Sequence, residues 1–223
     1  MKRSKILAKP LLAPLLSAAL LLSGTASTSA APVDAVDAGW ILSKLARPAP
    51  TRTSFVELRG SRLLKAPLRI EGEYQRPRAD TLVREVRAPY AETTTIRAGE
   101  VTIARNGKSR RFSLSRAPEL AGLQASFGAL LAGDRALLER HYRIDTQGTR
   151  QQWTLLLVPR DKGLAAKVQD ITLRGRGAEL RCIDTRAAGN APDAQQRTLL
   201  AGAARAAAGI DAPDRLAALC HGR

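Results

Sequence analysis

The chain has 223 residues and a net charge of +16, with 44% hydrophobic but only 4% aromatic residues. A charge this high suggests nucleic acid, anionic lipid or an acidic protein as a partner. The basic residues, however, alternate along short strands, and no basic helix or aromatic-studded basic strand that could stack nucleic-acid bases is present. We therefore expect no nucleic acid partner. The charge is interpreted as a solvated outer face, with contact to anionic headgroups as the alternative.

Residues 1–30 are predicted to be an export signal that is cleaved. Three basic residues open the segment, an apolar run from Leu11 to Leu22 follows, and small residues precede Ala30. The run is too short, and too interrupted by Pro14, for a membrane span. Cleavage would lower the net charge from +16 to +12. It would leave residues 31–223 as one domain in the periplasm.

A short helix is expected at Asp37–Ala46, and six closely spaced strands follow it. Their alternating and β-branched residues are typical of strands, and Asn106-Gly107 favours a type I′ hairpin turn. Arg76-Pro77 and Ala88-Pro89 are expected to mark strand ends, because proline cannot donate to a ladder. The six predicted strands are Arg52–Leu64, Leu68–Gln75, Thr81–Arg87, Ala91–Arg97, Glu100–Arg105 and Lys108–Ser115.

The hydrophobic period then changes from that of a strand to that of a helix. Pro118 suits a first helical turn. Gly133 is expected to stop this helix, and Asp134 to cap a second one that holds Leu137 and Leu138. The apolar residues at helical spacing, which are candidates to cover an interior cavity, are Leu120, Leu123, Phe127, Leu130 and Leu131.

Four more strands and a tail complete the chain. Trp153 to Val158 is apolar on both faces, so both faces are expected to be buried, and Trp153, Leu155 and Leu157 are further candidates to face a cavity. The tail from about residue 190 is Ala-rich and predicted to be helical. The four strands are predicted at His141–Thr146, Gln151–Pro159, Val168–Arg174 and Glu179–Asp184.

Two cysteines remain in the predicted exported domain, Cys182 and Cys220. In an oxidising compartment two cysteines most simply form one disulfide. This disulfide would attach the C-terminal helices to the sheet.

No constellation of residues for catalysis is found. The chain has two histidines, His141 and His221, and neither a GxSxG nor an HExxH motif. Gly107-Lys108-Ser109 lacks a preceding glycine at the spacing that a phosphate-binding loop needs. Two histidines without a cysteine pair at ligand spacing argue against a metal site. We therefore expect no enzymatic activity, no cofactor and no metal.

About ten evenly spaced strands around a helical insert predict an all-β barrel or a strongly curved sheet closed by helices. An apolar inner face without reactive groups suits an apolar ligand. A small barrel filled with its own side chains would give the same sequence pattern, so both interpretations stay open at this point.

Several short motifs occur along the chain, and their order indicates a family resemblance. They are Thr53-Ser54-Phe55, Glu71 through Pro77, Ala88-Pro89-Tyr90, Ile96 through Glu100, and Ile171-Thr172-Leu173. From about Ala35 to Asp184 this order resembles the LolA family, the periplasmic carriers of outer-membrane lipoproteins. The resemblance implies a mainly β fold with helices, in which an incomplete, strongly curved antiparallel barrel is closed by a helical lid over an apolar cavity.

The resemblance also implies a function and a set of partners. A monomeric carrier would hold the acyl chains of a lipoprotein or another lipid. It would receive them from an inner-membrane ABC transporter or other lipid exporter and deliver them to an outer-membrane receptor. In the family, the arginine of the Arg-Pro motif holds the lid closed by hydrogen bonds to helix backbone, and by position this role falls to Arg76.

Two departures from the family pattern leave other functions open. The chain has few aromatic residues, and after Asp184 it is expected to continue into Ala-rich helices where the family adds a final strand segment. One alternative is an accessory carrier for a non-lipoprotein lipid in a polyketide or pigment export pathway. The other is a non-catalytic structural or interaction domain with a filled core.

Overall fold

The computed structural model describes residues 35–60, 65–116, 128–189 and 195–222. The chain divides into two compact units, Met1–Ala31 and Pro32–Arg223, and all described residues belong to the second. The predictions for residues 1–30 and for Leu120, Leu123 and Phe127 lie outside the described ranges.

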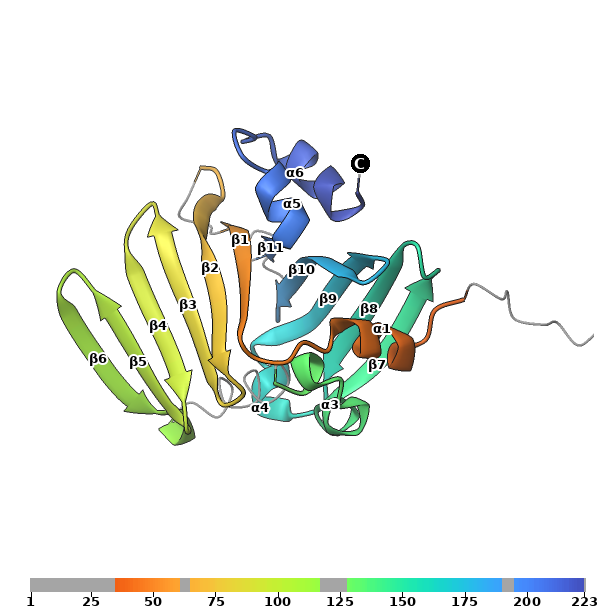
Figure 1. Cartoon of the computed structure of the whole chain (residues 1–223), viewed down its shortest axis with the longest axis horizontal. Coiled ribbons are helices and arrows are strands. Elements are labelled where there is room, and N and C mark those ends of the chain that lie inside the picture. Colours follow the sequence, from red (N-terminus) through yellow and green to blue (C-terminus); the bar gives the residue numbers. More distant parts are fainter. Residues whose placement is uncertain (1–34, 61–64, 117–127, 190–194, 223) are drawn as a thin grey trace, which may run out of the picture. The chain divides into compact units, whose positions relative to one another are not determined.

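Within the described residues, eleven strands form a single antiparallel sheet that is not closed into a barrel. Its order is β6-β5-β4-β3-β2-β1-β11-β10-β9-β8-β7, so β6 and β7 are the two edges (Figure 1). The predicted mainly β fold with an incomplete, curved antiparallel barrel is confirmed. The strands are β1 (Thr51–Arg59), β2 (Leu68–Arg78), β3 (Thr81–Ala88), β4 (Glu92–Arg97), β5 (Glu100–Arg105), β6 (Lys108–Ser113), β7 (Tyr142–Gly148), β8 (Trp153–Pro159), β9 (Val168–Arg176), β10 (Glu179–Ala187) and β11 (Gln195–Leu200).

The ten predicted strands correspond to β1 through β10, with small shifts at their ends. Asn106 and Gly107 have φ angles of 51° and 70°, and positive φ at both positions is what a type I′ turn requires. The prediction that Arg76-Pro77 ends a strand is wrong, because β2 continues to Arg78. The pairing with β3 becomes irregular between Gln75 and Arg78. A bulge of this kind accommodates a residue that cannot donate to the ladder.

The prediction of a helical tail from about residue 190 is wrong for its first part. Gln195–Leu200 forms β11, which pairs with β1 and with β10. Thr198 and Leu200 point to one face of the sheet and Leu199 to the other, which is the alternation of a strand. The expected departure from the family pattern, a missing final strand, is therefore also wrong.

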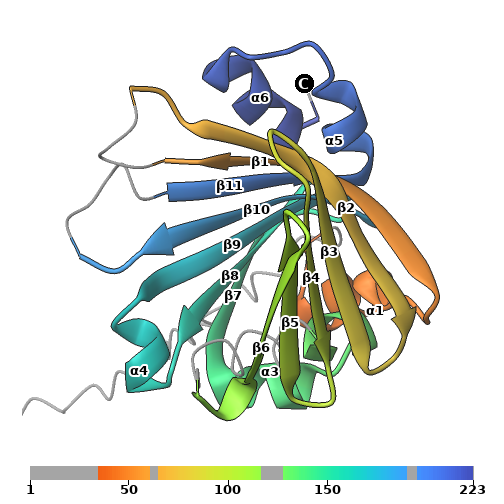
Figure 2. The same ribbon diagram turned by 90° about the vertical axis from the view of Figure 1, so that its left-hand side faces the viewer.

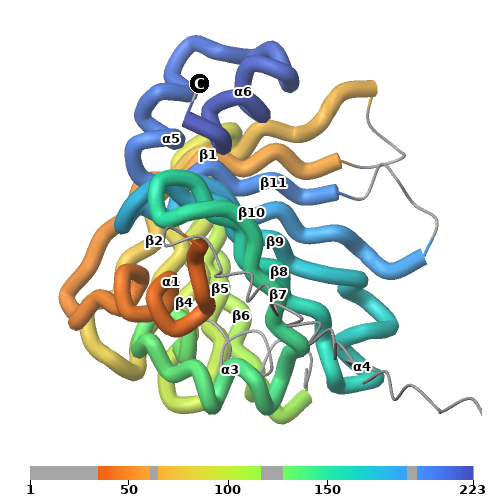
Figure 3. Tube along the Cα trace, turned by 90° about the vertical axis from the view of Figure 1, so that its right-hand side faces the viewer, coloured from red at the N-terminus to blue at the C-terminus, as the bar shows by residue number. Residues whose placement is uncertain are grey.

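The remaining elements are helical and cover both faces of the sheet. As Figures 2 and 3 show, α1 and α3 lie inside the curl of the sheet, whereas α5 and α6 lie on its outer side. The helical elements are α1 (Ala38–Leu45), a stretch at residues 128–132, α3 (Arg135–His141), α4 (Lys162–Ala165), α5 (Ala201–Ala206), α6 (Pro213–Cys220) and a 3-10 turn at Leu114–Arg116.

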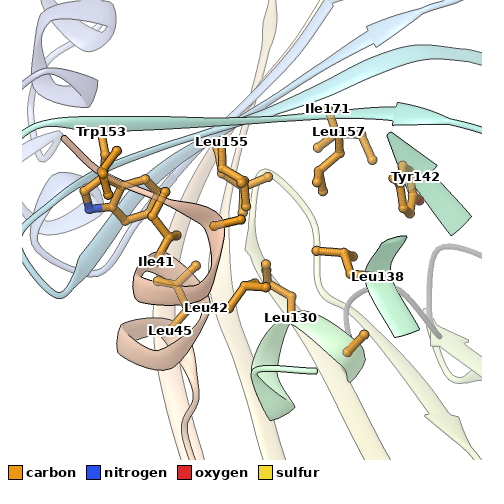
Figure 4. Packing of buried hydrophobic residues seen from close by; sticks show 14 of the residues in the cluster. Ile41, Leu42, Leu45, Leu130, Leu138, Tyr142, Trp153, Leu155, Leu157 and Ile171 are labelled. Atoms are coloured by element: carbon orange, nitrogen blue, oxygen red, sulfur yellow. The ribbon is translucent and has the colours of Figure 1, made fainter. Parts of the chain in front are cut away.

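The main core lies between the inner helices and the β7–β9 half of the sheet. Ile41 and Leu42 of α1 and Leu138 of α3 face Leu155 and Leu157 of β8, and all five are buried (Figure 4). Burying such aliphatic side chains stabilises the fold by about 1.5–3 kcal/mol each. This half of the concave face is therefore filled by packed side chains.

Strand β8 is fully buried on one face alone. Thr154, Leu156 and Val158, on its outer face, are half-buried. The prediction that both faces are buried is wrong, because the helices that cover the outer face lie over β1, β10 and β11 and not over β8.

Three contacts fix the C-terminal helices to the outer face. The predicted disulfide between Cys182 of β10 and Cys220 of α6 is confirmed. Arg69 donates hydrogen bonds to the carbonyls of Ala207 (3.0 Å) and Ile210 (2.7 Å), just after α5. Arg181 donates to the carbonyl of Leu219 (3.0 Å). The carbonyls at a helix C-terminus lack intrahelical donors and carry partial negative charge, so arginine is a suitable partner.

Removing the disulfide by a Cys182→Ala/Cys220→Ala double substitution is expected to lower the free energy of unfolding by about 3–4 kcal/mol, the loop-entropy value for a loop of this length. The sheet should persist, because both arginine contacts remain. Denaturant titration of oxidised and reduced wild-type protein beside the double variant measures this. A reductant should shift the wild-type midpoint and leave the variant unchanged. Equal midpoints for oxidised wild type and variant would contradict the expectation.

Gly175 in β9 is required by the Trp153 side chain that lies across it. A Cβ built on Gly175 would come within 2.0–2.5 Å of the Trp153 ring, and Trp153 Nε1 donates to the carbonyl of Gly177 at 2.9 Å. Gly175→Ala should therefore displace the indole, cost about 1–3 kcal/mol of stability and shift the tryptophan emission to longer wavelength. Gly128→Ala is the matched control, since its Cβ would meet nothing within 4 Å, and it should be neutral or slightly stabilising.

Candidate functional site

Three helical segments cover the concave face, and we call them the lid: α1, residues 128–132 and α3. Gly133, with φ of 70°, ends the second segment, and Asp134 caps α3 by accepting a hydrogen bond from the Leu137 amide at 2.9 Å. Both predictions are confirmed. A Cβ on Gly133 would come within 3.3 Å of Ala46 Cβ and of the Leu42 carbonyl oxygen. The lid segments thus approach each other closely at this turn.

A cavity of about 160 Å³ lies between the lid and the other half of the sheet. Its wall is mainly apolar, and Arg76, Gln75, Lys44 and Glu179 supply charged and polar groups. Ligand sites commonly have volumes of about 300–1,000 Å³, so this cavity is small with the lid in its present position. The apolar residues that line it are Leu45, Leu82, Leu130, Leu131, Leu180 and Leu200.

The structure divides the predicted cavity-facing residues into two groups. Leu130 and Leu131 line the cavity. Trp153, Leu155 and Leu157 lie on the concave face but are buried beneath the lid, in the main core. The physical reason is that the lid packs directly on β7–β9. Among the described residues, the cavity beside the lid is bounded by β1, β2, β3, β10 and β11.

A second, more open hollow of about 580 Å³ adjoins the cavity. It is lined by Ala46 to Ala49, by Arg76 to Ala79 and by Leu131 and Ala132. Arg47, Arg76 and Leu131 line both spaces. These three residues therefore form a shared wall between the cavity and the more open groove.

Arg76 donates hydrogen bonds to backbone carbonyls at this partition. Its Nη1 donates to the carbonyl of Arg47, which follows α1, at 2.8 Å, and its Nη2 lies 3.5 Å from the carbonyl oxygen of Ala79. The Arg47 amide in turn donates to the carbonyl of Leu131 at 3.1 Å. The backbone of one residue just after α1, Arg47, thus contacts the sheet, through Arg76, and a second lid segment, through Leu131. The resemblance indicated Arg76 by position, and its side chain lies against the backbone just after α1.

The concave face also carries a buried charged cluster, which we define as Glu57, Arg59, Arg84 and Tyr74. Glu57 is only 1% exposed, and its carboxylate accepts hydrogen bonds from Arg59 Nη2 at 2.6 Å and Arg84 Nη2 at 3.2 Å. The Arg84 guanidinium lies over the Phe55 ring at 4.9 Å from its centroid. Burial, and next the Glu57 carboxylate, raise the pKa of the Tyr74 phenol, so this hydroxyl is neutral; it hydrogen-bonds to Arg84.

This cluster was not predicted from the sequence, although the alternation of residues in β1 indicates an inward-facing carboxylate. Thr51, Thr53, Phe55 and Glu57 are two residues apart, and Thr51 and Thr53 line the cavity. Side chains at this spacing share a face of the sheet. A carboxylate at Glu57 therefore had to face inward, where it needs buried partners.

The described ranges contain neither a cluster of metal-ligating side chains nor a membrane-spanning helix. Residues 35–60, 65–116, 128–189 and 195–222 contain no group of three His, Cys, Asp or Glu side chains that could hold a metal ion. No helix among them is long and apolar enough to cross a membrane.

Comparison with solved structures gives weak likenesses to two proteins. A LolA superfamily protein from Nitrosomonas europaea is 13% identical, with 74% of this chain and 92% of that chain covered and a TM-score of 0.38. LprF from Mycobacterium bovis is 12% identical, with 74% and 91% covered and a TM-score of 0.33. These TM-scores are too low to support an argument about function. No curated protein matches the chain.

The sequence itself carries the family assignment. Residues 30–223 match the profile of a family described as "Outer membrane lipoprotein carrier protein LolA-like". The match spans every strand and the lid, and the predicted resemblance is confirmed. The chain belongs to the LolA-like family of outer membrane lipoprotein carrier proteins.

Proposed function

We propose that the protein is a periplasmic carrier that takes the acyl chains of a lipoprotein or another lipid into the space beneath its lid. Residues 1–30 direct its export, and residues 31–223 form the carrier domain. The cargo comes from an inner-membrane ABC transporter or other lipid exporter and passes to a receptor at the outer membrane. Membership of the carrier family supports this proposal, and a monomer is sufficient for it.

The partition between the cavity and the open groove is the observation that carries the proposal. The cavity of about 160 Å³ and the groove of about 580 Å³ are separated by Arg47, Arg76 and Leu131. Movement of α1 away from Arg76 would join them. The joined space falls within the range of about 300–1,000 Å³ that ligand sites commonly have. The lid therefore needs to move only at one edge to admit an acyl chain.

The alternative of a filled structural domain finds support in one half of the interior. The β7–β9 half is solid beneath the lid. The other half borders the cavity. Its apolar wall there includes Leu82, Leu180 and Leu200. A domain with a core of its own side chains does not require that space.

The protein purified from the periplasm of an expression host should bind a fluorescent fatty acid with a stoichiometry near one. It should also retain lipid that mass spectrometry identifies after extraction. Apolar burial of the acyl chain supplies the affinity. A protein of similar size that has no internal cavity serves as the control for adventitious binding. Absence of both uptake and copurifying lipid would refute the carrier proposal in favour of a filled domain.

Arg76→Leu is expected to preserve the fold and impair delivery of cargo. The arginine stabilises the closed, empty lid, and its half-exposed charged hydrogen bond contributes about 1 kcal/mol. Without it the open, loaded state gains about fivefold in population. The variant should bind the fluorescent fatty acid more tightly and transfer it more slowly to phosphatidylglycerol vesicles, which stopped-flow fluorescence measures.

Arg143→Leu is the matched control for this experiment. It removes the same charge from an exposed position on β7, opposite Val158, and Arg143 lines neither the cavity nor the groove. This variant should transfer fatty acid like the wild type. If Arg76→Leu also transfers at the wild-type rate, Arg76 does not act as a latch.

A further inference from the structure

The charged cluster of Glu57, Arg59, Arg84 and Tyr74 has no role in the carrier mechanism described above. Two guanidinium groups share the single carboxylate of Glu57, so the cluster has a net positive charge. Arg84 is 18% exposed and Arg59 is 48% exposed, whereas Glu57 is 1% exposed. The positive groups are thus the accessible part of the cluster.

Packing alone does not explain why these charges lie on the concave face. Apolar residues of similar volume commonly replace a buried ion pair without loss of stability. Ile70, opposite Glu57 in the neighbouring strand, is an apolar residue that this face accommodates. An arginine has five N–H donors. Within the described residues, Arg84 and Arg59 use only part of theirs on Glu57 and Tyr74.

The cluster meets the apolar cavity at Tyr74, whereas Glu57, Arg59 and Arg84 lie behind this residue and do not line the cavity. Arg84 is paired with Tyr74 across β2 and β3 and is two residues from Leu82 on the same face. Tyr74 and Leu82 both line the cavity. A head group that is bound by Arg84 would therefore be close enough to be part of the same molecule as an acyl chain in the cavity.

The latch and the cluster lie towards opposite ends of β1. Arg76 is opposite Thr51, and Ile70 is opposite Glu57. Thr51 and Glu57 are six positions apart along the strand, which corresponds to about 20 Å. A ligand that lies along this face would contact apolar side chains in the middle and positively charged side chains at the Glu57 end.

We propose that Arg84 and Arg59 bind the anionic head group of an amphiphile whose acyl chain occupies the cavity beneath the lid. This inference rests on the proposed carrier function and narrows its substrate class to an anionic lipid. Guanidinium groups bind phosphate through charge-assisted hydrogen bonds, and Glu57 holds both side chains in place.

Two probes with the same acyl chain test the inference: 1-acyl-glycerol 3-phosphate and the neutral monoacylglycerol, which differ only in the phosphate. Wild-type exported protein should bind the phosphate probe about tenfold more tightly, as measured by displacement of a fluorescent fatty acid. Arg84→Met should bring the ratio close to one with unchanged monoacylglycerol affinity. Glu57→Gln should raise the ratio, because it frees both arginines and preserves the shape of the side chain.

The opposite effects of Arg84→Met and Glu57→Gln separate head-group binding from a structural role. If the cluster only supports the sheet, both variants lower stability and affect the two probes equally. Arg105→Met is the matched control, since Arg105 lies on the same face, stacks on Tyr90 at 4.0 Å and is 3.8 Å from Glu92. It should leave the ratio unchanged. Thermal unfolding followed by circular dichroism verifies that each variant is folded.

Each remaining outcome has a definite meaning. A wild-type ratio near one, with both probes bound, overturns the inference and leaves the carrier proposal intact. Failure of both probes to bind overturns the carrier proposal and the inference with it. Inorganic phosphate alone should not displace the phosphate probe, because the acyl chain supplies most of the affinity. Displacement by inorganic phosphate would instead identify a site for free anions and overturn the assignment to a lipid.

Discussion

Arginine side chains link the sheet to three of the helices that cover it, by donating hydrogen bonds to backbone carbonyls at the helix ends or just beyond them. Arg76 does this for the end of α1 on the concave face, and Arg69 and Arg181 do it for α5 and α6 on the convex face. Such carbonyls carry partial negative charge, and a guanidinium group satisfies both the hydrogen bond and the charge. The single sheet can thus bury apolar residues on both of its faces.

The two helical covers differ in what holds them besides arginine. The convex cover has two arginine contacts and a covalent link between β10 and α6. The concave cover has extensive packing on β7–β9, but at the edge facing the cavity its contact with the sheet includes a single arginine, Arg76. The packing on β7–β9 opposes displacement of the whole lid. The half-exposed hydrogen bond of Arg76 contributes little stability and can break more easily. Movement of the lid should therefore be a tilt about its packed side.

Local pattern predicted most of the fold, and tertiary context decided the rest. Strand alternation located β1 to β10, and Gly133 and Asp134 located the turn inside the lid. β11 was missed because it is short and directly precedes an Ala-rich helix, so that its pairing with β1 and β10 outweighs the local helical pattern. The position of Arg76 was predictable from its motif. The partners of Glu57 were not, because Arg84 reaches it from another strand.

The inner face of the sheet changes in character from β8 to β3, and this gradient bears on the cargo. Beneath the lid, at β7–β9, the inner face is apolar and covered by packed side chains. Next to the lid it lines the cavity, and beyond the cavity it carries the charged side chains of Glu57 and Arg84. A cargo without a polar group would gain nothing from the charged end and would have to desolvate Arg84 there. An amphiphile gains from both ends when its chain points towards the lid and its head lies near Glu57. The arrangement of charge along β1 therefore favours one orientation of a single bound lipid.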